Sequence, residues 1–142
     1  MFVLGMDSAT AACSAAVVKD GDVLAQEFTE MARGHAEALV PIIKRVLEAA
    51  RCSVGELDLI AATVGPGAYT GVRIGLSTAQ TMSLAATVPL LGVTTLEAVA
   101  RAAQDVSGNE LLVLMDTKRA DFYAQAFDRW GTALGEPAAL TA

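Results

Sequence analysis

The chain is poor in histidine, cysteine and aromatic residues, and it carries more acidic than basic side chains. Its 142 residues include one histidine, two cysteines and 5% aromatics, and 10 basic residues stand against 16 acidic ones, giving a net charge of −6. Cys13 and Cys52 lie far apart and form no Cys-x-x-Cys motif, which favours a reducing compartment, the cytoplasm, over a disulfide framework. The acidic balance argues against a chain that grips a nucleic-acid backbone unaided.

No charged residue occurs between Ile74 and Leu96. A segment of this length raises the question of a membrane span, which needs about 20 mostly apolar residues. Its many polar and glycine residues make it too polar for that role, and Pro89 divides it. The apolar start, Met1–Met6, is too short for a signal peptide and has no basic residues before it. We therefore expect no membrane segment.

The hydrophobic patterns predict an alternation of strands and helices. Strands are expected at 2–6, 13–18, 23–28, 59–64, 89–93, 111–115 and 122–127, and helices at 35–50, 53–56, 71–87 and 96–104. The Asp20-Gly21 pair predicts a tight hairpin between the second and third strands, and Ser53 with Glu56 has capping-box spacing. This order is that of a ribonuclease-H-like half-domain, an α/β fold in which helices pack on a mixed sheet.

A weak internal repeat indicates the start of a second lobe. Two similar segments, Val3–Ser8 and Leu112–Thr117, each place an aspartate at the end of an apolar strand that continues into a candidate hairpin. The residues after the second hairpin leave no room for the helices that follow the first one. The sequence therefore predicts one complete lobe, residues 1–107, and the opening hairpin of an incomplete second lobe, residues 108–142.

The most distinctive segment is a glycine motif, Gly65-Pro-Gly-Ala-Tyr-Thr-Gly-Val-Arg-Ile-Gly75, which follows an apolar strand and leads into a helix. Gly65 and Gly67 can adopt backbone angles closed to other residues and let the backbone approach a neighbour closely. Thr70 is the candidate N-cap of the helix. A helix that starts after a glycine loop can bind phosphate, but this loop lacks the lysine of a P-loop. Phosphate binding and tight strand–helix packing both fit the motif.

Small residues recur every four positions along the helix that follows, at Gly71, Gly75, Ala79 and Ser83. A ridge of small side chains lets a second helix pack closely, and no charge follows Arg73 to mark a solvated face. The ridge is therefore a candidate surface for a partner helix, and burial within its own lobe is the alternative. Arg73 either anchors a carboxylate across such an interface or covers a backbone carbonyl.

Four segments together resemble the TsaB (YeaZ) family of bacterial tRNA threonylcarbamoyladenosine biosynthesis proteins. They are the glycine motif, Met6–Thr10 with Cys13–Val17, Gly34–Leu39 and Leu91–Leu96. The resemblance runs over nearly the whole chain, although members of this family are two-lobed and longer. It implies the actin-like ATPase (ASKHA) fold, here as one ribonuclease-H-like lobe with a mixed sheet plus the opening hairpin of a second lobe.

The resemblance also implies a function. TsaB-like proteins are non-catalytic partners of a TsaD-like subunit, which carries the metal and transfers the threonylcarbamoyl group to tRNA, and a TsaE-like ATPase belongs to the same complex. Helices of the first lobe mediate both homodimers and pairing with TsaD in that family. The resemblance therefore implies an accessory subunit, inactive alone, that pairs with a TsaD-like protein or with itself and meets tRNA only through the complex.

Two aspartates, Asp7 and Asp116, lie where actin-like kinases and ATPases place carboxylates around Mg²⁺ and phosphate. Together with Gly65 and Gly67 they are the candidates for a nucleotide site. The alternative is that each aspartate caps the turn that follows it. Because most of the second lobe is missing from the sequence, we do not expect this chain to bind ATP alone.

No catalytic or metal site is predicted. His35 is the only histidine, and it is expected to be solvated or hydrogen-bonded at a helix start. The positions that match the His-x-x-x-His metal pair of TsaD-like subunits are Thr95 and Val99, and neither supplies an imidazole. Two other functions stay open beside the scaffold: an actin-like kinase or ATPase fragment, and a glycoprotease-type metallopeptidase. Bound Mg-ATP would indicate the first, and bound metal the second.

Overall fold

The computed structural model describes residues 1–103 and 108–141, which form two compact units, Met1–Val93 and Thr94–Ala142. The sequence predicts the boundary at 107/108 instead, with the third helix in the first lobe. The structure groups that helix with the second unit because its apolar residues pack on the strands there. No helix among the described residues is long and apolar enough to cross a membrane.

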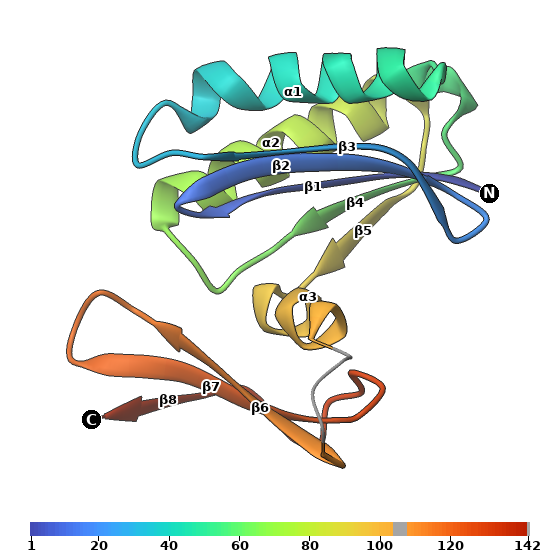
Figure 1. Ribbon diagram of the computed structural model, residues 1–142. Coiled ribbons are helices and arrows are strands. Elements are labelled where there is room, and N and C mark those ends of the chain that lie inside the picture. The colour runs from blue at the N-terminus through green and yellow to red at the C-terminus, as the bar shows by residue number, and fades with distance from the viewer. Residues whose placement is uncertain (104–107, 142) are drawn as a thin grey trace. The chain divides into compact units, whose positions relative to one another are not determined.

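The first unit is a five-stranded mixed sheet with two helices on one face (Figure 1). Its elements are β1 (Phe2–Thr10), β2 (Ala12–Lys19), β3 (Asp22–Glu30), α1 (His35–Ala50), the short 3-10 helix η1 (Val54–Glu56), β4 (Leu59–Thr63), α2 (Tyr69–Ala86) and β5 (Leu90–Val93). The strand order is β3-β2-β1-β4-β5, in which β1–β3 form an antiparallel meander and β4 and β5 run parallel to β1. The predicted α/β fold with a mixed sheet is confirmed.

Helix α1 packs on the sheet through one apolar stripe. Its buried residues follow the helical repeat and are Leu39, Ile42, Ile43, Val46 and Leu47. Burying each of the larger side chains contributes about 2 kcal/mol. Beside the stripe, the Arg45 guanidinium donates two hydrogen bonds to the Glu27 carboxylate, at 2.9 and 2.6 Å, and so ties the helix to edge strand β3. The helix therefore holds the meander together.

Two predicted turns are confirmed. Asp20 and Gly21 both have positive φ, 50° and 97°, as a tight hairpin between β2 and β3 requires. At η1, the Glu56 carboxylate accepts hydrogen bonds from the Ser53 backbone N–H at 2.8 Å and from the Ser53 hydroxyl at 2.6 Å. Local turn chemistry therefore fixes both of these chain reversals.

The second unit is a three-stranded antiparallel sheet with one helix. Its elements are α3 (Thr95–Ala102), β6 (Glu110–Asp116), β7 (Asp121–Asp128) and β8 (Ala138–Thr141), and the strand order is β6-β7-β8. Leu96 and Ala100 of α3 pack against Val113 and Phe127 of the sheet. The predicted hairpin is present, but β8 adds a third strand to it. The predicted end of the helix, Gln104, lies outside the described residues.

The predicted start of α2, Gly71, is two residues too late. The helix begins at Tyr69 with Ala68 as its N-cap residue, and Thr70 lies inside the first turn. The backbone N–H of Ala68 donates to the carbonyl of Ala9 in β1 at 2.7 Å. That bond holds Ala68 in an extended conformation, so the helix begins at the next residue without a side-chain cap.

Candidate functional site

The glycine loop lies against the end of β1. Gly65 has a φ of +101°, a conformation that side chains rarely adopt. A Cβ added to Gly67 would lie 2.4 Å from the carbonyl oxygen of Ala9, so this position has no room for a side chain. Ala68 donates its N–H to that same oxygen. The loop backbone therefore touches β1 directly, and one amide at the start of α2 is used within the protein rather than left for a phosphate.

The ridge of small residues on α2 continues this contact. A Cβ added to Gly71 would lie 2.1 Å from the carbonyl oxygen of Ser8, and one added to Gly75 would lie 2.7 Å from the Ser8 hydroxyl oxygen. That hydroxyl donates a hydrogen bond to the Gly71 carbonyl at 2.8 Å. Ala79 follows one turn later and is fully buried. The ridge therefore packs within its own unit.

This placement corrects the predicted partner surface. The sequence offers Gly71, Gly75 and Ala79 for contact with a partner helix, but in the structure these three residues are buried. Ser83 is half-buried, and its hydroxyl donates to a backbone carbonyl of the following turn at 2.6 Å. Of the predicted partner-binding residues, Arg73 alone is exposed. A partner surface on α2 must therefore be sought on the opposite face of the helix.

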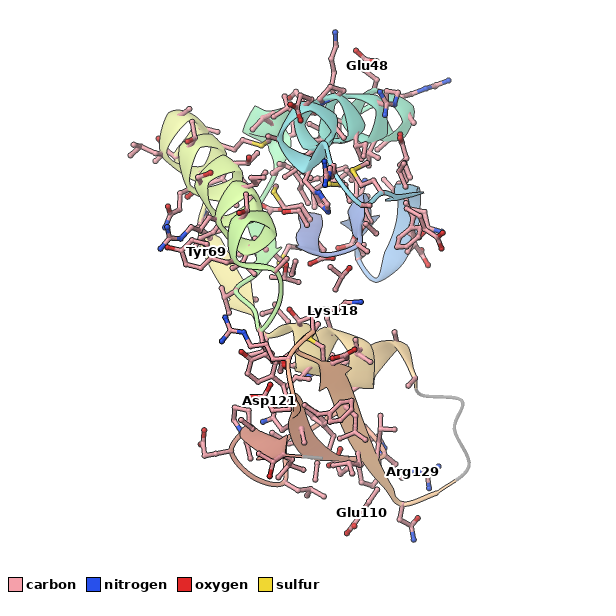
Figure 2. The ribbon with its side chains drawn as sticks, turned by 90° about the vertical axis from the view of Figure 1, so that its left-hand side faces the viewer. Glu48, Tyr69, Glu110, Lys118, Asp121 and Arg129 are labelled. Atoms are coloured by element: carbon pink, nitrogen blue, oxygen red, sulfur yellow. The ribbon has the colours of Figure 1, made fainter. Side chains whose placement is uncertain are left out.

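The opposite face of α2 is exposed and carries little charge. Its residues recur at helical spacing and are Tyr69, Arg73, Ser77, Gln80, Thr81 and Leu84, here named the outer stripe. Leu84 is 85% exposed and Tyr69 is 70% exposed, and Figure 2 shows Tyr69 at the start of the helix. Arg73 is the only charged residue of α2, and its guanidinium carbon lies 3.8 Å from the centre of the Tyr69 ring.

The two candidate aspartates both accept hydrogen bonds within the protein. Strand β1 is longer than predicted, so Asp7 lies inside the strand rather than after it. Its Oδ1 accepts hydrogen bonds from the Ala9 N–H at 3.1 Å and from the Thr63 hydroxyl at the end of β4. Asp116 likewise accepts from the Lys118 N–H at 2.7 Å. The turn-capping alternative thus describes Asp116, whereas Asp7 accepts its hydrogen bonds within β1 and from β4. The part of both aspartates in a nucleotide site stays a prediction.

His35 and Cys13 meet at the start of α1. The His35 Nε2 lies 2.9 Å from the carbonyl oxygen of Thr10, which confirms a hydrogen-bonded histidine at a helix start. The Cys13 thiol donates to the His35 carbonyl at 3.8 Å. Burial, with a smaller contribution from Asp7, raises the pKa of Cys13, so its thiol stays protonated near neutral pH. Both side chains therefore fasten α1 to the sheet rather than form a nucleophile–base pair.

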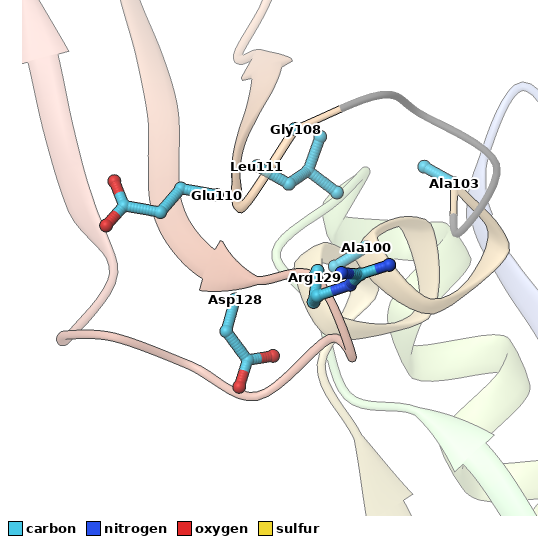
Figure 3. A pocket seen from close by; sticks show the side chains of 7 residues that line it. All are labelled: Ala100, Ala103, Gly108, Glu110, Leu111, Asp128 and Arg129. Carbon is cyan, nitrogen blue, oxygen red and sulfur yellow. The ribbon is translucent and has the colours of Figure 1, made fainter.

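A small hollow lies at the end of α3, where Ala100, Asp128 and Arg129 are among its lining residues (Figure 3). The Asp128 carboxylate accepts hydrogen bonds from the backbone N–H groups of Thr132 at 2.8 Å and Trp130 at 2.9 Å, and these bonds lower its pKa. That carboxylate therefore stabilises the turn after β7. Across the described part of the chain, no group of three or more His, Cys, Asp or Glu side chains is arranged to hold a metal ion.

Sequence reasoning identifies neither the contact made by Ser8 nor, apart from Arg73, the residues of the outer stripe. Ser8 is 1% exposed, and Gly71 and Gly75 of α2 pack against it. Nothing around Ser8 in the sequence indicates this contact. The outer stripe does have a signal, because it lies on the helix face opposite the small-residue ridge. Small residues allow the helix to approach a neighbouring backbone most closely. The ridge is therefore expected to face that backbone, and the outer stripe to face the exterior.

We expect Gly71→Ala to destabilise the protein. Alanine has the higher helix propensity by about 1 kcal/mol, so a net loss of stability reports the contact with Ser8. Moving β1 or α2 to admit the new Cβ is expected to cost about 3 kcal/mol, measured as the free energy of unfolding in urea.

Gly135→Ala is the matched control, because the Cβ position of Gly135 is open and its φ is compatible with side chains. Its unfolding free energy is expected to change by less than about 0.5 kcal/mol. Equal stability of the two variants would show that α2 does not rest on β1 in this way.

Comparison with known proteins agrees with the resemblance. The sequence model of the family described as TsaD, tRNA N6-adenosine threonylcarbamoyltransferase, matches residues 23–140. The chain is 35% identical over 130 residues to the tRNA threonylcarbamoyladenosine biosynthesis protein TsaB of Escherichia coli (strain K12), covering 91% of this chain and 56% of that protein. The chain thus spans little more than half the length of this relative.

Solved structures support the same assignment. YeaZ from Pseudomonas aeruginosa matches with a TM-score of 0.89 at 29% sequence identity, over 99% of this chain and 67% of that one. The ROK hexokinase from Thermus thermophilus shares the fold alone, with a TM-score of 0.59 at 19% identity over 96% of this chain and 49% of that one. The actin-like ATPase fold is therefore confirmed. The chain belongs to the family that the TsaD model describes, and within it the chain is a relative of the TsaB (YeaZ) proteins.

Proposed function

We propose that this chain is a non-catalytic scaffold subunit in tRNA threonylcarbamoyladenosine biosynthesis, which pairs with a TsaD-like catalytic subunit and, without it, with itself. The observation that carries the proposal is the similarity to a TsaB protein over 91% of the chain. The outer stripe of α2 supplies the contact surface. A helix face with a single charge, an exposed tyrosine and an exposed leucine has the composition of a protein contact.

The side chains of this chain support an accessory role. Thr95 and Val99 stand where a TsaD-like subunit has its metal-binding histidine pair, and neither can supply an imidazole. Cys13 keeps its proton near neutral pH, and the His35 ring bonds to a backbone carbonyl. The proposal therefore assigns the transfer chemistry to the partner.

Binding of tRNA is also assigned mainly to the partner. A nucleic-acid backbone is held by several basic side chains that neutralise phosphates, whereas this chain has a net charge of −6. Two of its arginines, Arg45 and Arg101, are already paired with Glu27 and Glu97. In this proposal the chain meets tRNA, and a TsaE-like ATPase, only within the assembled cytoplasmic complex.

Reconstitution tests the proposal. With the TsaD-like subunit and the other enzymes of the pathway present, adding the chain is expected to raise the yield of threonylcarbamoyladenosine in tRNA, measured by mass spectrometry of digested nucleosides. The chain alone is expected to form none. Modified nucleoside made with this chain as the sole protein would refute the non-catalytic role, and a yield independent of the chain would refute the scaffold role.

We expect Leu84→Arg to weaken pairing, because docking would then bury a charge without a partner. Leu84 is 85% exposed, so the melting temperature should stay that of the wild-type chain. The measurement is light scattering of the chain alone and mixed with the TsaD-like subunit. Leu112→Arg, on a leucine of the second unit that is 58% exposed, is the matched control and should pair normally.

An arginine substitution on the ridge of small residues cannot serve as this test. In Gly75→Arg the new side chain must displace Ser8, so lost pairing would not be separable from lost folding. Normal pairing of the Leu84→Arg variant would place the contact away from the outer stripe.

A further inference from the structure

Arg73 is an exposed cation without an acidic partner in the described structure. It is the only charged side chain of α2, and it forms no ion pair with any residue in 1–103 or 108–141. Arg45 and Arg101, in contrast, each bind a glutamate of this chain. Because acidic residues outnumber basic ones by 16 to 10, an unpaired guanidinium on a face with no other charge is poised for an anion from another molecule.

Tyr69 orients this guanidinium. The Arg73 guanidinium carbon lies 3.8 Å from the centre of the Tyr69 ring, well inside the range of about 6 Å for a cation–π contact. The stack holds a long side chain in place, so less conformational entropy is lost when its N–H groups bind. The free edge of the planar group presents two parallel donors, which match the two oxygens of a carboxylate.

We propose that Arg73, stacked on Tyr69, binds a carboxylate of the TsaD-like partner, so that an aspartate or glutamate of that subunit faces the start of the outer stripe. The proposal rests on the proposed function and names the chemistry of its contact. Tyrosine and arginine dominate the binding energy at the centre of protein interfaces. The uncharged neighbour Ser77, one turn further along the helix, adds no competing charge beside the pair, and exclusion of water on docking would strengthen it.

The surroundings favour a carboxylate over a phosphate of tRNA. A nucleic-acid site combines several basic side chains along the path of the backbone, whereas Arg73 is the single cation of the outer stripe. At the far end of the stripe, Leu84 exposes an aliphatic side chain that has nothing to contact in a phosphate backbone. One oriented guanidinium on a stripe with no other charge and with an exposed leucine at its far end fits a protein partner that presents one acidic residue.

The test is titration calorimetry of the full chain with the TsaD-like subunit. Arg73→Gln is expected to weaken binding about 30-fold or more, because the partner's carboxylate is left buried and unpaired. Arg73→Lys should lose less, since the ammonium keeps the charge but cannot bind bidentately. Tyr69→Phe keeps the ring and should bind normally. Arg129→Gln removes the same charge from an exposed arginine of the second unit and is the matched control.

The outcomes separate this inference from the function on which it rests. A wild-type chain that does not bind the TsaD-like subunit refutes the proposed function and this inference with it. Wild-type binding that Arg73→Gln leaves unchanged overturns only the role of Arg73. If Arg73→Gln instead weakens binding to labelled tRNA, measured by fluorescence anisotropy without the partner, while subunit binding is intact, the ligand is a phosphate and the inference fails. Rescue of Arg73→Glu by a lysine at one acidic position of the partner would confirm it.

Discussion

The backbone contact between α2 and the end of β1 is the constraint on which the first unit depends. Gly67, Gly71 and Gly75 bring the loop and the helix so close to Ser8 and Ala9 that a Cβ at any of the three would overlap β1. Hydrogen bonds across the contact, including that from the Ser8 hydroxyl, then fix the helix along its axis. The same contact fixes the rotation of α2, since turning Gly71 and Gly75 inward turns the outer stripe outward. A packing requirement thereby determines which face of α2 is exposed.

Several titratable side chains of the described structure form hydrogen bonds to its backbone. Asp116 and Asp128 accept hydrogen bonds from the backbone of the turn that follows, and Asp7 accepts one from the backbone of its own strand. The Cys13 thiol and the His35 ring bond to backbone carbonyls. A catalytic group needs free access to a substrate, whereas these groups are occupied in hydrogen bonds to the backbone. This distribution supports the proposal that the chain contributes surface to a complex and leaves the transfer chemistry to a TsaD-like subunit.

Local signals in the sequence were sufficient for much of the fold. Helix α1 is predicted within a residue because its apolar positions follow one clear stripe, and the Asp20-Gly21 hairpin follows from turn chemistry. Strand β8 is not predicted, because alanine-rich residues acquire a strand conformation only by pairing with β7. The unit boundary is displaced for a similar reason: the periodicity of α3 does not say which sheet it covers, and its packing on Val113 and Phe127 places it in the second unit.

The candidate site, like the fold, is predicted from the sequence only in part. The glycine motif is evident in the sequence, but its helix carries small or weakly polar residues on most faces, so the helical period cannot tell which ridge meets the sheet. Arg73 is identified as a partner residue from the sequence and lies on the exposed face, whereas Gly71, Gly75 and Ala79 turn inward. Packing against Ser8, which is remote from α2 in the sequence, determines which face of the helix turns toward the sheet.

The central claim is that the outer stripe of α2 is the surface on which the TsaD-like subunit docks. The direct measurement is the rate at which a maleimide labels Ser77→Cys, free and with the partner at saturation. Cys13 and Cys52 are both buried and give a low background. The account predicts fast labelling of the free chain and strong protection in the complex. Equal rates in the two states, with binding established independently, would contradict it.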